Sequence, residues 1–213
     1  MVDKPNVEPE LSNVPEPIGN ALAVLGRELA QCGHEWLVGG SVGILLQGVH
    51  LHNAVPRDLD LYADESEAKA LHRALAAYSV DGQALSETDR YRSLLSHYEI
   101  EGVTVELVGA FRVETGGSHY EARIGGLLGR YAASRKLNGN EIRFMPLVHE
   151  LVFNVLRERA DRYDPVAEAL RAANGQHAKL LQEMIRTNRF SSAHLKKLEE
   201  LLGLRLQSGG TAG

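Results

Sequence analysis

Two aspartates stand two residues apart in the segment RDLDLYA, at positions 58 and 60. Polar and apolar residues alternate there, which predicts a β-strand with one buried face. On such a strand Asp58 and Asp60 share one side, while Leu59 and Leu61 share the other. Two carboxylates this close raise each other's pKa, and a bound divalent cation removes that cost. Taken alone, an exposed strand face is the usual explanation of such a pair.

A third acid, Glu106, lies in the segment VTVELV, where apolar residues alternate with Thr104 and Glu106. If this strand pairs with residues 58 to 62 and turns its apolar side inward, Glu106 lies on the face that carries both aspartates. Three converging carboxylates indicate a metal cluster for phosphoryl transfer. The expected ion is Mg²⁺, because it prefers hard oxygen ligands and commonly binds carboxylates together with substrate phosphates.

The segment VGGS, which ends at Ser41, predicts a phosphate site. Gly39 and Gly40 end a predicted strand and let the backbone approach a ligand, and Ser41 begins a predicted helix. Free N–H groups and the helix dipole at that point favour phosphate. A tight turn that needs glycine explains the same residues, and the segment is neither a Walker A loop nor a dinucleotide fingerprint. Because the next strand carries the aspartates, we expect this turn beside the metal ligands.

These residues are positioned by helices and strands that alternate through the first two-thirds of the chain. A helix is predicted over 15–33, where apolar residues recur at helical spacing after two prolines. Asp64 and Glu67 form an expected capping box that opens a helix to about Ala77. The other predicted elements are a strand at 35–40, a helix at 41–47, strands at 90–100 and 103–111 joined by Glu101-Gly102, and a hairpin around Asn138-Gly139.

From Leu147 the sequence changes to three amphipathic helical patterns, over 147–159, 165–187 and 191–202, the second of which Gly175 would break. Pro165 is the expected start of the second helix, and Ser191 or Ser192 the expected cap of the third. The expected fold class is therefore α+β (α/β), with a small mixed sheet flanked by helices and a C-terminal helical subdomain. The expected boundaries are a disordered leader at 1–14, the α/β core at 15–146, the helical subdomain at 147–205 and a disordered tail at 206–213.

The composition is that of an ordinary globular chain of 213 residues, with 44% hydrophobic and 24% charged residues. The single cysteine, Cys32, excludes an internal disulfide and fits a reducing cytoplasm, where we expect the protein. The net charge of −5 argues against broad affinity for nucleic acid or anionic membrane. No apolar stretch is long enough to span a bilayer, so neither nucleic acid nor a membrane is an expected partner.

The combination of VGGS, a helix, RDLDLY and then VELVG resembles the nucleotidyltransferase superfamily, which has the DNA polymerase β-like fold. That pattern consists of a Gly-Gly or Gly-Ser turn, a strand with two acids separated by one residue, and a third acid on a nearby strand. The resemblance covers residues 18 to 110 and extends loosely to about 174. Within the superfamily, the sequence is most similar to the small bacterial group that contains antibiotic adenylyltransferases and toxin-type transferases.

The resemblance implies a role for each motif. Gly39, Gly40 and Ser41 would hold the triphosphate of a nucleoside triphosphate. Asp58 and Asp60 would bind Mg²⁺, and Glu106 would complete a second metal site or act as general base. An acceptor hydroxyl would then attack the α-phosphorus and release pyrophosphate. Arg57 could brace the carboxylates or a phosphate, and it could equally be a charge at the edge of a strand.

Two features depart from the superfamily pattern. The third acid is often aspartate, whereas Glu106 is one methylene longer. Relatives often carry a lysine in the first helix after the sheet, and the segment PLVHELVFNVLRERADRYD contains none. Arg157 or Arg159 could contact phosphate in its place, although a solvated helix face is the simpler explanation of such charges.

The expected function is Mg²⁺-dependent transfer of a nucleoside monophosphate to a hydroxyl of a small molecule or a protein. One alternative is a catalytically impaired protein of the same fold that binds nucleotide and regulates another process. A second alternative is the toxin component of a toxin–antitoxin pair. A homodimer or an antitoxin are therefore the possible protein partners.

Overall fold

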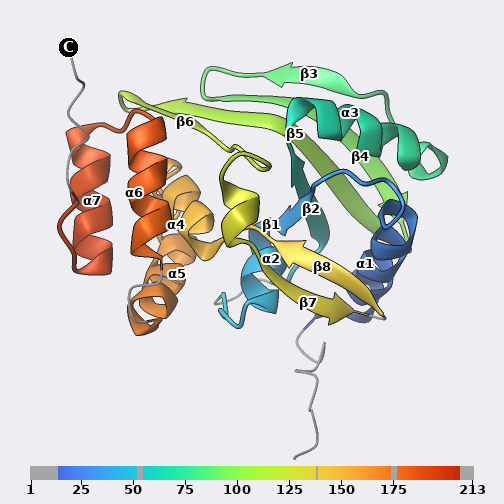
Figure 1. The fold of residues 1–213 in the computed structure, drawn as a ribbon, viewed down its shortest axis with the longest axis horizontal. Coiled ribbons are helices and arrows are strands. Elements are labelled where there is room, and N and C mark those ends of the chain that lie inside the picture. Colours follow the sequence, from blue (N-terminus) through green and yellow to red (C-terminus); the bar gives the residue numbers. More distant parts are fainter. Residues whose placement is uncertain (1–13, 52–54, 138, 174–176, 207–213) are drawn as a thin grey trace, which may run out of the picture.

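The computed structural model describes residues 14–51, 55–137, 139–173 and 177–206, which fold around one mixed β-sheet (Figure 1). Within these residues the strand order is β3-β4-β5-β2-β1-β8-β7, and β6 pairs with β5 beside this path. The strands are β1 (Leu37–Gly39), β2 (Asp58–Ala63), β3 (Ala84–Glu87), β4 (Tyr91–Ile100), β5 (Val103–Thr115), β6 (Ser118–Glu121), β7 (Ala133–Leu137) and β8 (Asn140–Phe144). The expected mixed sheet is confirmed, with β3 and β6 as additions that the sequence did not predict.

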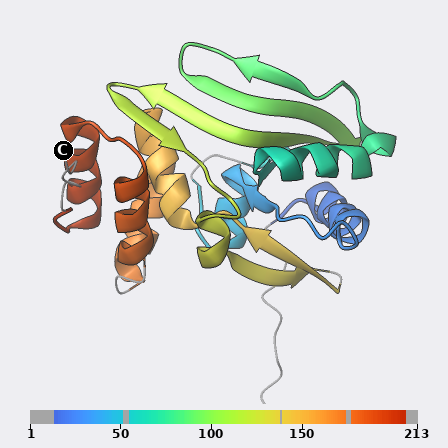
Figure 2. The ribbon, with the colours of Figure 1, turned by 45° about the horizontal axis from the view of Figure 1, so that its top comes forward.

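Helices cover the sheet in two groups, one on each side of it (Figures 1 and 2). The first group consists of α1 (Glu16–Leu29) and α3 (Glu65–Ala74), which pack on Leu61 and Leu107. The second group covers the opposite side of the sheet, where it packs on Tyr62 and Val108. It consists of α4 (Leu147–Leu156), α5 (Ala160–Ala172), α6 (Ala178–Thr187) and α7 (Ser192–Leu202). Because successive side chains of a strand point to opposite faces of the sheet, neighbouring residues of β2 and β5 pack into two separate hydrophobic cores.

Strand β2 lies at the centre of the sheet, and its two neighbours determine which side chains meet. It runs parallel to β5, with Asp60 opposite Glu106. It runs antiparallel to β1, with Asp60 opposite Gly39. The third neighbouring element, α2 (Gly40–Leu46), begins directly where β1 ends. The pairing assumed from the alternation in VTVELV is thus the one that the fold adopts.

The expected hairpin turns and strand positions agree with the structure. Glu101 and Gly102 join β4 to β5 with φ values of 54° and 73°, a left-handed conformation suited to a tight hairpin. Gly139, between β7 and β8, has φ of 84°. Its neighbour Asn138 lies outside the described residues.

The expected capping box at Asp64 is wrong, although a helix does begin there. Asp64 occupies the N-cap of α3, but its side chain makes no capping hydrogen bond. Its carboxylate instead accepts hydrogen bonds from the backbone N–H groups of Ile124 and Gly125, each at 2.8 Å. The helix also ends at Ala74, earlier than expected, and a short 3₁₀ helix at Ala76–Tyr78 follows it. A distant loop has therefore outcompeted the local helix for this side chain.

Replacing Asp64 by alanine should therefore destabilise the protein through the loop at Ile124 and not through α3. We expect the free energy of unfolding to fall by about 1–3 kcal/mol, because two backbone N–H groups lose a charged acceptor. Chemical denaturation measures this change, and Asp64→Asn, which keeps one acceptor oxygen, should lose less. Equal stability of the alanine variant and the wild type would contradict this account.

The C-terminal helices form where expected, but two of their boundaries are corrected. Helix α4 ends at Leu156 and not at 159, because Glu158 takes a left-handed φ of 59°. Helix α5 begins at Ala160, so Pro165 lies inside it and not at its start. At this position proline removes the bond to the carbonyl of Asp161, and its ring crowds that carbonyl, so α5 forms in spite of a local cost. The expected cap at Ser191 is confirmed, since its hydroxyl accepts from the backbone N–H of His194 at 3.4 Å.

Both ends of the described chain belong to the folded part. Val14 is buried, so the leader expected over 1–14 is one residue too long, and 1–13 lie outside the described residues. Leu206 packs on the helical core, and its N–H donates to the Glu199 carboxylate at 2.7 Å, so the tail expected from 206 also begins too early. Residues 207–213 and the expected break at Gly175 lie outside the described residues. None of the described helices is long and apolar enough to cross a bilayer.

Candidate active site

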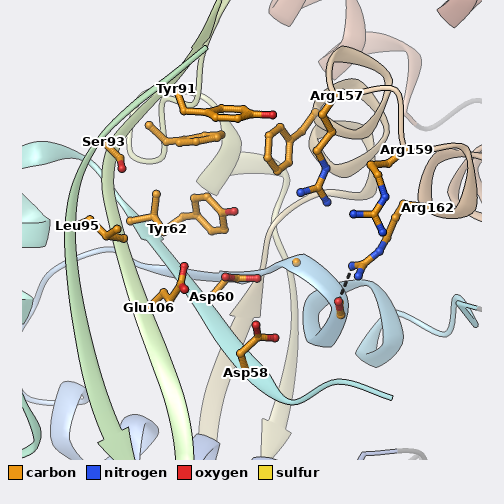
Figure 3. A pocket seen from close by; sticks show the side chains of 15 residues that line it. Asp58, Asp60, Tyr62, Tyr91, Ser93, Leu95, Glu106, Arg157, Arg159 and Arg162 are labelled. Carbon is orange, nitrogen blue, oxygen red and sulfur yellow. Dashed lines mark hydrogen bonds between the residues drawn. The ribbon is translucent and has the colours of Figure 1, made fainter. Parts of the chain in front are cut away.

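A cavity of about 380 Å³ opens where the central strands meet the C-terminal helices (Figure 3). Most of its lining side chains are of three kinds: acids from the sheet, arginines from the turn between α4 and α5 and from α5 itself, and aromatic or apolar residues from the sheet and from α4. The lining residues are Gly40, Ser41, Asp58, Asp60, Tyr62, Tyr91, Ser93, Leu95, Glu106, Val108, Phe111, Phe153, Arg157, Arg159 and Arg162. The structure therefore brings Asp58, Asp60, Glu106, Gly40 and Ser41 together around one space.

The three acids lie on one face of β2 and β5, as the alternation predicts. The pKa of Asp60 is raised to about 7, first by burial and then by the negative charges of Asp58 and Glu106. Among the described residues, no hydrogen bond or ion pair reaches the side chain of either aspartate, and Oε1 of Glu106 lies 3.9 Å from Nε2 of His97. Like charges gather here without a protein cation between them.

This arrangement fits a divalent cation in its chemistry. The donors are hard carboxylate oxygens, and the mutual repulsion that raises the pKa of Asp60 is the cost that a cation removes. As they stand, no three acidic, histidine or cysteine side chains of the described part of the chain are grouped tightly enough to hold one ion. The acids line the cavity together and leave space between them (Figure 3).

The backbone at Gly40 lies so close to the side chain of Asp60 that a residue with a Cβ atom would not fit there. Gly40 has φ of 61°, and a Cβ atom there would overlap Oδ2 of Asp60. A Cβ at Gly39 would lie 2.6 Å from the ring of Tyr62. Gly39 precedes the turn and does not line the cavity, whereas Ser41 does. The glycines are thus required by contact with the protein's own site.

Glu150 holds this turn from the first turn of α4. Its side chain is 1% exposed, and Oε1 accepts a hydrogen bond from the N–H of Gly40 at 2.8 Å. Burial raises the pKa of Glu150 to about 8, partly opposed by that hydrogen bond. The N–H of Gly40 therefore has a partner within the protein and is not a free donor for phosphate, contrary to the expectation from the sequence. The sequence feature that could have indicated a buried role for Glu150 is that it is a single acid directly before the apolar residues Leu151 to Phe153.

The raised pKa of Glu150 predicts a dependence of stability on pH. The folded value of about 8 lies above the ordinary 4.5, so the contribution of this group is fully present below pH 4.5 and is lost as pH rises through 8. Glu150→Gln keeps an acceptor for Gly40 and removes the titration. In EDTA, its melting temperature should therefore vary less between pH 5 and 8 than that of the wild type.

A second variant at this position separates charge from hydrogen bonding. Glu150→Leu leaves the N–H of Gly40 without its acceptor, so its free energy of unfolding should be about 1–3 kcal/mol below that of Glu150→Gln at every pH. Some slope remains in both variants, because the pKa of Asp60 is shifted in the same direction. Identical pH profiles for the wild type and Glu150→Gln would contradict the assignment.

Three arginines form the side of the cavity opposite β4 and β5 (Figure 3). Arg157 donates twice to Oδ1 of Asn154, at 2.9 and 2.7 Å, and lies 4.3 Å over the Phe153 ring. Burial lowers the pKa of Arg157, although the group stays a cation. Arg162 donates to the hydroxyl of Ser41, and its buried Nε has no hydrogen-bond partner among the described residues but lies 3.9 Å from Oδ2 of Asp161. Arg157 therefore does not lie on the solvated helix face that the sequence analysis considered for it.

The remaining arginines differ from these two. Arg159 lines the cavity, but its side chain is 46% exposed and pairs with Asp161 at 2.7 Å. The solvated helix face considered from the sequence therefore holds in part for Arg159. Arg57 is exposed just before β2 and does not line the cavity. Arg162 was missed by sequence reasoning, because it lies in α5 whereas Arg157 caps α4, and their separation of five residues is not a spacing that places side chains on one helix face.

A mixed sheet with two acids on one strand, a third on its parallel neighbour and a glycine turn on its antiparallel neighbour defines a nucleotidyltransferase. The family model of aminoglycoside-2''-adenylyltransferase matches residues 21–150, which is more than half of the chain. The protein belongs to this family and is a nucleotidyltransferase. The match spans the glycine turn, all three acids and Glu150.

A solved structure shows the same fold at low sequence identity, and two others align less closely. A candidate nucleotidyltransferase from Thermotoga maritima is 22% identical, with a TM-score of 0.58 over 75% of this chain and 94% of its own. ANT(2'')-Ia in complex with adenylyl-2''-tobramycin is 12% identical, with a TM-score of 0.42 over 87% and 95%. An antigenic nucleotidyltransferase-like protein from Paracoccidioides brasiliensis is 12% identical, with a TM-score of 0.43 over 91% and 95%. A comparison with curated proteins finds no match.

Proposed function

We propose that this protein transfers a nucleoside monophosphate from a nucleoside triphosphate to a hydroxyl of a small molecule, in a reaction that depends on Mg²⁺. The observation that carries the proposal is the register of β2, which sets Asp60 opposite both Glu106 and Gly39. This register places the acids and the glycine turn around one cavity. The family membership supports nucleotidyl transfer as the reaction.

The arginine side of the cavity is suited to the triphosphate. Arg157, Arg159 and Arg162 supply cationic donors, and Ser41 adds a hydroxyl that is already oriented by Arg162. Arginine binds phosphate oxygens in pairs through its planar fork of N–H groups. These side chains take the place of the lysine that many relatives carry, and they would also stabilise charge on the departing pyrophosphate.

The acids would hold Mg²⁺ between Asp58, Asp60 and Glu106, and the ion, when bound, neutralises charge that develops on the phosphoryl oxygens. In the reaction, a bond forms between the acceptor oxygen and the α-phosphorus, and the bond from the α-phosphorus to the pyrophosphate oxygen breaks. The hydroxyl proton leaves to a carboxylate, for which Glu106 is the candidate on the β4 side of the cavity.

Label transfer tests this proposal. The purified protein is incubated with Mg²⁺, each of the four α-labelled triphosphates in turn, and a panel of hydroxyl compounds, and the products are separated. We expect labelled product and an equal amount of pyrophosphate with at least one nucleotide, and neither product in EDTA. Calorimetry with a non-hydrolysable triphosphate gives an independent readout. A protein that fails to bind any of the four analogues in Mg²⁺ would contradict the proposed function.

A further inference from the structure

We infer that His97 is a ligand of a divalent metal ion that it shares with Glu106, and that Asp81 holds the imidazole in the state that binds the ion. The inference rests on the proposed function, because it concerns the ion beside the third acid of the site. It gives that ion one nitrogen ligand, which suits a first-row transition ion such as Mn²⁺. The observations behind it are the position of the ring, its partner Asp81 and the gap between the ring and Glu106.

The sheet places His97 directly beside Glu106. The two residues lie opposite each other in the antiparallel pair of β4 and β5. Ser93 and Leu95 of β4 line the cavity, and His97 follows them at the spacing that keeps side chains on one face of a strand. Its Nε2 atom lies 3.9 Å from Oε1 of Glu106, and the two side chains are 31% and 38% exposed. His97 therefore lies at the rim of the site, where an ion from solvent can reach it.

Asp81 binds the other edge of the imidazole. Its Oδ1 atom accepts a hydrogen bond from the backbone N–H of His97 at 2.8 Å, and its Oδ2 atom lies 2.5 Å from Nδ1 of the ring. These bonds, first that of the backbone and then that of the ring, lower the pKa of Asp81, so the carboxylate is an acceptor only. Nδ1 therefore carries a hydrogen, and in the neutral ring the lone pair is on Nε2, which faces Glu106. A carboxylate in this position is the usual partner of a metal-binding imidazole.

The segment that carries Asp81 is fixed along β4 by its own backbone. The N–H of Val80 donates to the carbonyl of His97 at 3.0 Å, and Ser79 forms an antiparallel bridge with Tyr98. Asp81 and His97 therefore keep their relative position without a ligand. A ligand group whose orientation is set in advance in this way binds an ion at a smaller entropic cost.

The gap between His97 and Glu106 fits a shared ion better than a direct contact. A distance of 3.9 Å is too long for a hydrogen bond, and none reaches the Glu106 carboxylate from the described part of the chain. Two ligands of one ion, each about 2.0–2.2 Å from it, lie about 3–4 Å apart. Within the described ranges no third acidic, histidine or cysteine side chain joins these two. Phosphate oxygens of the nucleotide and water would complete the shell, as is usual for ions that bind with nucleotides.

The nitrogen ligand changes which ions the site prefers. Mg²⁺ takes oxygen ligands and keeps several waters, whereas imidazole suits first-row transition ions. We therefore expect Mn²⁺ to bind at His97 and Glu106 more tightly than Mg²⁺ does, while Asp58 and Asp60, which supply only oxygen, discriminate less. Glu106 has two carboxylate oxygens, so one can bind the ion while the other receives the proton of the acceptor hydroxyl.

Pulsed electron paramagnetic resonance of bound Mn²⁺ tests the inference directly, because it detects nitrogen in the first coordination shell. The intact protein is loaded with Mn²⁺ alone and with Mn²⁺ plus each of the four α,β-methylene nucleoside triphosphates. We expect coupling to one imidazole nitrogen in the wild type and its loss in His97→Gln. Loss of even an outer hydrogen-bond partner of a ligand costs about 10–100-fold in affinity, so His97→Gln should raise the Kd for Mn²⁺ about tenfold or more. The Kd for Mg²⁺, measured by displacement, should change less, because glutamine supplies an oxygen.

Asp81→Asn tests the role of Asp81 as a positioning residue. The asparagine carbonyl can keep the bond from the backbone N–H of His97, which turns its NH₂ group toward Nδ1 of the ring. Nδ1 then accepts, Nε2 carries the hydrogen, and the imidazole has no lone pair left for the ion. We expect loss of the nitrogen coupling and a rise of about 10–100-fold in the Kd for Mn²⁺, with an unchanged circular dichroism spectrum.

His119→Gln is the matched control for the loss of a histidine. His119 also pairs with a carboxylate, since its Nδ1 lies 2.9 Å from Oε1 of Glu114, but it belongs to β6 and does not line the cavity of the acids. This variant should keep the nitrogen coupling and the Kd of the wild type.

Each other outcome has a definite meaning. Mn²⁺ that binds to the wild type without nitrogen coupling would overturn the inference and leave the proposed function standing, because His97 would then be a cation that pairs with Asp81 and Glu106. Coupling that persists in His97→Gln would overturn it as well, and coupling that persists in Asp81→Asn would overturn the role of Asp81. A wild type that binds neither Mn²⁺ nor Mg²⁺, with or without nucleotide, would instead contradict the proposed function itself.

Discussion

Replacement of Asp60 by asparagine should lower nucleotidyl transfer by about 10³-fold and, in the absence of metal, make the protein more stable. Transfer falls because the central carboxylate of the site is lost, and single electrostatic groups of this kind are typically worth about 10²–10³ in kcat. The side chain keeps its size, so the turn at Gly40 stays in place. Initial rates of label transfer in Mg²⁺ measure the loss.

The opposite effect on stability follows from the pKa of Asp60. Its folded value of about 7 lies above the ordinary 3.8, so its contribution is fully present below pH 3.8 and is lost as pH rises through 7. At pH 8 in EDTA the wild type carries the full cost of the charge, whereas Asp60→Asn does not, and its melting temperature should be higher. Asp164→Asn, at an exposed position in α5, is the matched control and should change neither quantity. A variant that retains transfer, or that melts lower than the wild type at pH 8, would contradict the assignment.

Replacement of Gly40 by alanine should reduce transfer by about 10²-fold and also destabilise the fold. The added Cβ overlaps Oδ2 of Asp60, and the left-handed φ of 61° costs a non-glycine residue about 1–2 kcal/mol. Relief of the overlap must move Asp60 or the turn, and a shift of about 1 Å at a reacting centre can cost about 10²-fold in rate. Transfer rates and chemical denaturation measure the two effects.

The matched control for this variant is Gly82→Ala. Gly82 has no atom within 4 Å of a built Cβ, so the same substitution meets open space there. We expect unchanged transfer in the control and normal thermal stability. If Gly40→Ala retains the activity of the wild type, the close approach of the turn to Asp60 has no part in catalysis.

The acids of the site could be predicted because their information is local. Alternation in RDLDLYA and VTVELV sets the side of each strand on which Asp58, Asp60 and Glu106 lie, and a buried face leaves little freedom in register. The close approach of Gly40 to Asp60 followed from the same order of elements. The pairing of β2 with β5 was assumed, because β3 and β4 lie between them in the sequence, and once it is given the period of a strand sets the shared face.

The cationic half of the site could not be predicted in the same way. Arg157 and Arg162 reach the cavity through the docking of α4 and α5, which depends on packing between distant residues. Glu150 faces Gly40 across 110 positions of sequence. Strand β3 is short and largely exposed, so it carries no hydrophobic period that could have revealed it. Asp64 failed as a cap for a related reason, since tertiary partners overrode a local motif.

The negative and positive charges of the cavity come from separate parts of the chain. Every lining acid precedes residue 107, and every lining arginine follows residue 156. Affinity for the nucleotide can therefore drift in evolution through the C-terminal helices while the chemical step stays under constraint in the sheet. A chimaera that takes its C-terminal helices from a relative would inherit that relative's phosphate preferences, provided that it keeps an acid at position 150 to bind the N–H of Gly40.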